Sequence, residues 1–116
     1  MNLLVNVDST PLLNAVIVEG SLLFPSNPSP THLRTFDARY VFVNKGLLEI
    51  GTENDPYTSK LQITMHGVKS SPEIPIYGNK VIAVREGTLD IHGIPRTLTW
   101  TSLATTAEIG DTTITL

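Results

Sequence analysis

Three segments of the chain share one pattern of apolar and polar positions. They are AVIVEGSLLF at residues 15–24, VFVNKGLLEI at 41–50 and IAVREGTLDI at 82–91. Each has an apolar run, a charged residue and a glycine, followed by apolar residues at every second position. Such alternation is typical of a β-strand with one buried face. The pattern therefore predicts three units, each made of a strand, a tight corner and a second strand.

The alternation also assigns side chains to the inner face of each unit. Before the glycine these are Ala15 and Ile17, Val41 and Val43, and Ile82 and Val84; after it they are Leu22 and Phe24, Leu48 and Ile50, and Leu89 and Ile91. The structural turn glycines are Gly20, Gly46 and Gly87. Glycine adopts positive φ without steric cost, so we expect that conformation at all three corners.

Two architectures satisfy this repeat. Antiparallel pairing inside each unit would give three hairpins, which build a β-sandwich or barrel. Parallel pairing between successive units would make the corners bends in the rungs of a β-helix. The gap before the third unit holds an extra strand, KLQITMHG (60–67), and a loop, VKSSPEIPIYG (68–78). Insertions at one face suit a solenoid. The all-β fold is therefore predicted as a short parallel β-helix segment, with the β-sandwich as the alternative.

Three segments outside the repeat carry further predictions. FPSNPSPTHLRTFD (24–37) contains three prolines and predicts a flexible excursion. TLTWTSL (97–103) alternates, and its phase places Trp100 in the core with Leu98. GDTTITL (110–116) predicts a strand. A chain of 116 residues is long enough for one domain with its own core, so we expect a single domain over residues 1–116.

Composition excludes several classes of function. The formal net charge is −3 and the basic residues are dispersed, so nucleic acid is not an expected partner. The absence of cysteine removes disulfides, thiolate catalysis and zinc sites built on cysteine. No apolar run approaches the roughly 20 residues needed to cross a bilayer, so we expect no membrane insertion by this segment.

Two histidines are the first candidates for a ligand site. His66 ends the strand QITMH and His92 ends TLDIH, both with outward phase and both followed by glycine. If the two strands stack in register, the histidines become neighbours, with Asp90 nearby. Only His32 remains as a third histidine, so the set is too small for a metal site and none is predicted. Arg85, Arg96 and Lys80 are further candidates, for contact with a carboxylate-bearing glycan.

Acidic residues offer two weaker possibilities. The turn EIGTENDPY (49–57) carries oxygen ligands for calcium but lacks the ordered spacing of an EF-hand. Asp90 with Glu49 or Glu86 would supply paired carboxylates for glycoside hydrolysis, yet nothing distinguishes them from solvated surface charges. The residues therefore favour a non-enzymatic protein without a cofactor, with calcium as the minor alternative.

Three stretches together resemble a known family. LEIGTENDPYTSKLQITMHG, REGTLDIHGIPRTLTWTSL and LLNAVIVEGSLLF are similar to the G-eight domain, from about Val5 to Leu116. This domain occurs in fibrocystin (polyductin) and fibrocystin-like proteins, and in cell-migration-inducing and transmembrane cell-surface hyaluronidases. The order DPYTSK, ITMHG, PEIPIYGNKVIAVREG is most similar to the fibrocystin branch. Family members carry a Trp-containing lead segment before the point matching Leu4, and this chain is expected to lack it.

The resemblance implies a location and a role. Family members place the domain on the extracellular side of large cell-surface, ciliary or secreted proteins, at the start of a right-handed parallel β-helix. The implied function is a non-catalytic module that caps the adjacent β-helix region and contacts hyaluronan, another glycan or a protein ligand. The alternative is the binding part of a hyaluronan-cleaving glycosidase unit completed by downstream domains.

Overall fold

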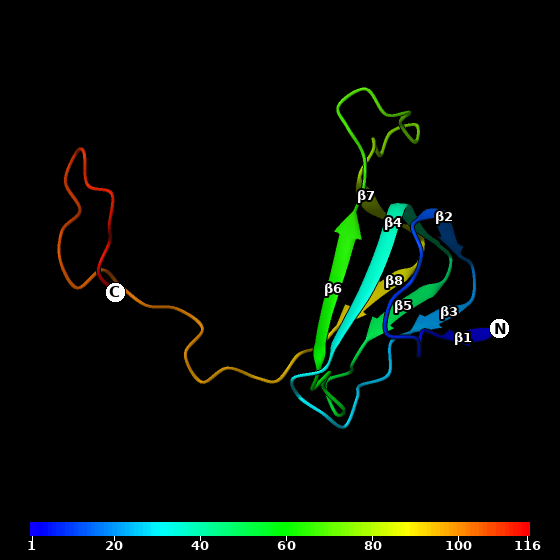
Figure 1. Ribbon diagram of the computed structural model, residues 1–116, viewed down its shortest axis with the longest axis horizontal. Coiled ribbons are helices and arrows are strands. Elements are labelled where there is room, and N and C mark those ends of the chain that lie inside the picture. Colours follow the sequence, from blue (N-terminus) through cyan, green and yellow to red (C-terminus); the bar gives the residue numbers. More distant parts are fainter.

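Eight β-strands and no helix form the folded part of the chain in the computed structural model, which describes residues 1–116 (Figure 1). No helix is therefore available to cross a membrane. The strands are β1 (Asn2–Leu4), β2 (Leu13–Val18), β3 (Ser21–Leu23), β4 (Leu33–Asn44), β5 (Leu47–Ile50), β6 (Lys60–Met65), β7 (Val81–Arg85) and β8 (Thr88–Ile91). The prediction of an all-β protein is confirmed.

The strands form two parallel sheets. Sheet A has the order β1-β3-β5-β8, and sheet B has the order β2-β4-β6, with β7 also paired to β4. All six strand pairs are parallel. Each predicted unit thus sends its first strand into sheet B and its second into sheet A. No strand pairs with the other strand of its own unit, so the hairpins required by the β-sandwich alternative do not form.

Strand β4 is long enough to hold two partners on one edge. Its first half, Leu33–Ala38, pairs with β6, and its second half, Tyr40–Asn44, pairs with β7. Strand β2 occupies the opposite edge. The chain between β6 and β7 leaves the sheet as a loop, as Figure 1 shows. The predicted extra strand and inserted loop are confirmed.

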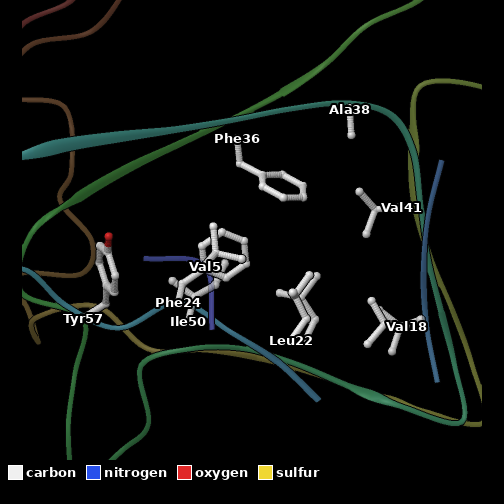
Figure 2. Packing of buried hydrophobic residues seen from close by; sticks show 11 residues of the cluster. Val5, Val18, Leu22, Phe24, Phe36, Ala38, Val41, Ile50 and Tyr57 are labelled. Atoms are coloured by element: carbon white, nitrogen blue, oxygen red, sulfur yellow. The ribbon is translucent and has the colours of Figure 1, made fainter. Parts of the chain in front are cut away.

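The core lies between the inner faces of the two sheets (Figure 2). Phe24 and Phe36 meet edge to face at its centre, with their ring centroids 5.3 Å apart. The predicted inner-face residues of the second unit are buried, as are Leu22 and Phe24 of the first. Leu89 and Ile91 keep the predicted register opposite Leu48 and Ile50. They remain 40% and 55% exposed because β8 is the outermost strand of sheet A.

The first unit departs from the predicted phase by one residue. Val16 pairs with Val41 and Val18 with Val43, whereas Ile17 is 64% exposed on the outer face. Two residues, 19 and 20, lie between Val18 and Ser21, but three residues, 44–46, lie between their register partners Val43 and Leu47. Aligning the units on their glycines therefore shifts the first strand, so the assignment of Ala15 and Ile17 to the inner face was wrong.

The corner glycines do not adopt positive φ, which corrects the expected reason for their presence. The residues before two of them do so instead: Lys45 has φ 59° and Glu86 has φ 51°. The glycines are required by close backbone approach between units. A Cβ atom on Gly46 would lie 2.6 Å from the carbonyl oxygen of Gly20, and one on Gly87 would lie 2.7 Å from that of Gly46.

Two peripheral segments also differ from the predictions. The excursion after Phe24 ends at Leu33, where β4 begins, and the backbone amide of Asn27 donates a hydrogen bond to Ser59 Oγ at 3.0 Å. Residues 92–116 contain no strand, so both strands predicted there were wrong. This C-terminal tail extends away from the sheets in Figure 1, and Trp100 is 81% exposed instead of buried.

Candidate functional site: a polar cleft beside His66

The loop between β6 and β7 folds against the outer face of sheet B. The hydroxyl of Tyr40 on β4 donates a hydrogen bond to the carbonyl oxygen of Pro72 in the loop. Two residues further along β4, the Phe42 ring packs on the ring of Tyr77, with the ring centroids 5.4 Å apart. Within the loop, Asn79 Nδ2 donates to the carbonyl oxygen of Ser71 at 3.0 Å. These contacts fix the position of the loop relative to the sheet.

A cleft of about 390 Å³ lies between this loop and the sheet. Most of the residues that line it are polar or charged: Asn14, Arg39, Tyr40, His66, Ser71, Pro72, Glu73 and Ile74. Arg39 follows Ala38, the last residue of β4 that pairs with β6, and precedes Tyr40, the first that pairs with β7. At this junction Arg39 is exposed and Tyr40 is half-buried, whereas Ala38 and Val41 on either side of them are buried.

His66 is held at the cleft by Asp37. Its Nε2 atom lies 2.6 Å from Asp37 Oδ1, and both side chains are partly exposed. The backbone fixes each partner: the amide of His66 donates to the carbonyl oxygen of Ala38 at 2.8 Å, and the amide of Asp37 donates to Thr10 Oγ1 at 3.0 Å. The imidazole is therefore oriented before any ligand arrives.

The remaining charges of the cleft have no ionic partner. Neither Arg39 nor Glu73 takes part in any salt bridge of the structure. A guanidinium with free donors is suited to a carboxylate, which it binds through two parallel hydrogen bonds. Ser71 also lines the cleft, but its hydroxyl accepts the amide of Val68 at 2.9 Å and makes no bond to His66. The cleft therefore contains no serine–histidine relay.

The structure separates the two histidines that the sequence placed together. His66 follows β6 in sheet B, whereas His92 follows β8 in sheet A. Because β6 and β8 belong to different sheets, the two strands do not stack in register, and the condition under which the histidines would be neighbours is not met. Asp90 is near His92 as expected, with Asp90 Oδ1 2.7 Å from His92 Nε2. For the third histidine, His32, the Nε2 atom lies 3.0 Å from Asp8 Oδ1, but the two atoms do not form a hydrogen bond.

The basic candidates lie outside the cleft. Arg85 ends β7 and its Nε atom is 4.0 Å from Glu86 Oε1, while Arg96 belongs to the exposed tail. Lys80 precedes β7 with φ 51°. None of the three lines the space beside His66.

The acidic candidates are brought together only in part. Glu49 and Asp90 are register partners on β5 and β8, on the outer face of sheet A, whereas Glu86 lies at a corner, 3.7 Å from Lys45. The turn proposed for calcium closes on itself, because the amide of Asp55 donates to Thr52 Oγ1 at 3.0 Å. No three His, Asp or Glu residues are grouped as a metal site. Calcium binding stays a prediction.

Sequence reasoning missed three residues that matter. Arg34 is 4% exposed and donates to the carbonyl oxygens of Val7 at 2.9 Å and Pro25 at 2.6 Å, and to the hydroxyl of Tyr57 at 3.3 Å. Its alternation with Phe36 and Ala38 was the available signal. Asp37 and Arg39 carried no local signal, because their roles depend on the pairing of β4 with β6.

Comparison with known proteins assigns the family. The model of the G8 domain matches residues 1–104, and the chain belongs to that family. It is 43% identical over 103 residues to Fibrocystin-L of Homo sapiens, and 36% identical over 109 residues to Fibrocystin of Canis lupus familiaris. These matches cover 89% and 93% of the chain but only 2% and 3% of the two relatives, which are therefore very large proteins. No solved structure matches the chain.

Proposed function

We propose that this G8 domain is a non-catalytic module on the extracellular side of a large cell-surface protein. It forms a segment of a right-handed parallel β-helix, caps the adjoining rungs, and binds a carboxylate-bearing glycan in the polar cleft beside His66. The proposal of a ligand rests on Arg39, whose guanidinium forms no salt bridge and lines the cleft in which Asp37 orients His66.

The parallel stacking of the units supports the β-helix. Successive corners are joined directly, since the amide of Leu47 donates to the carbonyl oxygen of Gly20 at 2.8 Å, and that of Thr88 to Gly46 at 2.9 Å. Strands β1 and β8 each leave one edge of sheet A without a partner. Unpaired edges with exposed apolar side chains favour further strands at both ends of the stack. The large size of the relatives leaves ample chain for such rungs.

The relatives favour the non-catalytic role over the hyaluronan-cleaving alternative. Both relatives named above are fibrocystins and neither is named as a hyaluronidase. Within the chain, two of the carboxylates considered for glycoside hydrolysis already have ionic partners: Asp90 contacts His92 and Glu86 contacts Lys45. We propose no cofactor for the glycan contact.

A titration followed by amide NMR tests the ligand site. Hyaluronan oligosaccharides, which carry one carboxylate per disaccharide, should shift the amides of residues 37–40, 66 and 71–74. Arg39→Ala should weaken binding by about 10-fold or more, which corresponds to loss of one charge-assisted hydrogen bond. The matched control is Arg96→Ala, which removes an exposed arginine outside the cleft and should leave the affinity unchanged.

A second pair of variants separates the two histidine–aspartate pairs. His66→Ala should weaken binding because the ring lines the cleft, whereas His92→Ala should not, although it removes an equivalent contact with Asp90. Equal losses for the two variants, or shifts that cluster around residues 88–92, would contradict the assignment of the cleft. A dispersed spectrum that does not change when the oligosaccharide is added would exclude hyaluronan as the ligand.

A further inference from the structure

An apolar groove opens at the end of the stack where β6 and β8 lie outermost. Its volume is about 530 Å³, and its apolar residues are Ile50, Tyr57, Leu61, Ile63 and Ile91. Strand β6 pairs only with β4, and β8 pairs only with β5. The groove is thus the open end of the core, with an unpaired strand edge on each side of it.

The C-terminal tail begins at this groove. His92 and Gly93 line it, and the amide of Tyr57 donates to the carbonyl oxygen of His92 at 2.7 Å. Gly93 forms a parallel bridge with Tyr57, three residues before β6 starts. The chain therefore leaves sheet A beside β6 and runs in the same direction. Three residues, 94–96, separate Gly93 from Thr97, and the four residue steps from Gly93 to Thr97 span up to about 13 Å when extended.

Part of the tail, residues 97–103, also has the alternating apolar and polar side chains of a β-strand. In residues 97–103, Leu98 and Trp100 alternate with threonines, and they are 84% and 81% exposed. Threonine favours strands, and the alternation gives the segment one apolar face. The family match extends to residue 104, so this segment belongs to the family pattern although it makes no strand here.

We propose that residues 97–103 of this chain bind as a strand parallel to the free edge of β6, with Leu98 opposite Leu61 and Trp100 opposite Ile63. Strict continuation from the Tyr57–Gly93 bridge would place Thr97 opposite Leu61, so this register needs one additional residue in the connection. The stack already contains such a difference, since two residues lie between Val18 and Ser21 but three lie between their partners Val43 and Leu47. The inference rests on the β-helix part of the proposed function, which it extends by one strand, and is independent of the glycan cleft.

Trp100 is the only tryptophan, so its fluorescence reports on the groove directly. In the folded 116-residue chain we expect emission at a shorter wavelength than in the same chain unfolded in urea, with reduced quenching by acrylamide. Leu98→Asp should return the emission to the unfolded wavelength, because it places a carboxylate against Leu61. The matched control is Ile109→Asp, which alters another exposed apolar residue of the tail, outside the segment, and should change nothing.

Amide hydrogen exchange supplies the second measurement, with protection expected at alternate residues of 97–103. A dispersed amide spectrum combined with the unfolded emission wavelength would overturn this inference and leave the β-helix intact. Loss of dispersion in the body would instead refute the stacked fold on which both proposals rest. A blue shift that grows with protein concentration would assign the groove to the tail of a second copy and overturn binding within one chain.

Discussion

Gly46→Ala adds a single methyl group at the corner between β4 and β5. The new Cβ atom would lie 2.6 Å from the carbonyl oxygen of Gly20 and 2.8 Å from the carbonyl carbon of Val18, with the Val18 oxygen closer still. These are backbone atoms of the neighbouring corner, so no side chain can rotate away. The two corners must separate for the methyl group to fit.

The required displacement sets the size of the effect. Carbon–oxygen contacts normally begin near 3.3 Å, so the corner must move by about 0.7 Å from the Gly20 oxygen and by more than that from the Val18 oxygen. Movement of that size strains the packing by about 1–3 kcal/mol. It also weakens the hydrogen bond from the amide of Leu47 to Gly20, at present 2.8 Å, which adds about 1 kcal/mol. Lower entropy of the unfolded alanine chain offsets about 0.4–1 kcal/mol.

We therefore expect Gly46→Ala to lower the free energy of unfolding by about 2–3 kcal/mol, a large fraction of the 5–15 kcal/mol typical of a domain. Urea unfolding followed by far-ultraviolet circular dichroism measures this difference. Gly93→Ala is the matched control, since its Cβ would have no neighbour within 4 Å and its φ is not positive. It should stay within about 0.5 kcal/mol of the wild type.

A third variant separates crowding from backbone strain. Gly78 has φ 83° and open space around its Cβ position, so Gly78→Ala should cost only the strain of positive φ, about 1 kcal/mol. If Gly46→Ala destabilises no more than Gly93→Ala, close approach of the corners does not explain Gly46. Because Gly46 does not have positive φ, its cost should come from crowding alone and exceed that of Gly78→Ala; an equal or smaller cost would mean that the corner accommodates the methyl group with less strain than calculated.

Two further predictions use the same urea assay. Arg34→Met should lower the free energy of unfolding by about 2–4 kcal/mol, because the carbonyl oxygens of Val7 and Pro25 lose their donor. Tyr57→Phe removes only the third acceptor of Arg34 and should cost under about 1 kcal/mol. Equal costs for the two variants would contradict the role of Arg34 as donor to the two carbonyl oxygens. Lys45 has φ 59°, which strains a residue with a side chain. Lys45→Gly should therefore raise the free energy of unfolding by up to about 1 kcal/mol, and Lys45→Val should lower it by about 1–2 kcal/mol. The opposite order would refute backbone strain at this corner.

The strands of the body were predictable because their signal is local. Alternation of Leu22 with Phe24, or of Leu48 with Ile50, is visible within a few residues, and all four side chains are buried. The phase of β2 was not predictable in the same way. It depends on whether two or three residues lie between the register positions of the two sheets, as they do after Val18 and after Val43, and the glycine at the corner does not encode that number.

The candidate site was less predictable because its parts come from distant segments. His66 has an outward phase that sequence alone reveals, but its partner, Asp37, lies 29 residues earlier in the chain. That contact exists only because β6 pairs with the first half of β4. The tail shows the converse: residues 97–103 have the alternation of a strand but pair with no other strand in the structure, because alternation within a segment does not specify its partner.

Charge and packing together indicate where an anionic ligand can bind. The space between the sheets is filled by the core cluster, which leaves the outer faces and the ends of the stack. On the outer face of sheet A, Glu49 and Asp90 lie side by side and repel a second carboxylate. At the open end the groove beside β6 is apolar and favours a hydrophobic segment. The outer face of sheet B offers Arg39, which forms no salt bridge with Glu73 or any other carboxylate, and we propose that an acidic sugar binds there.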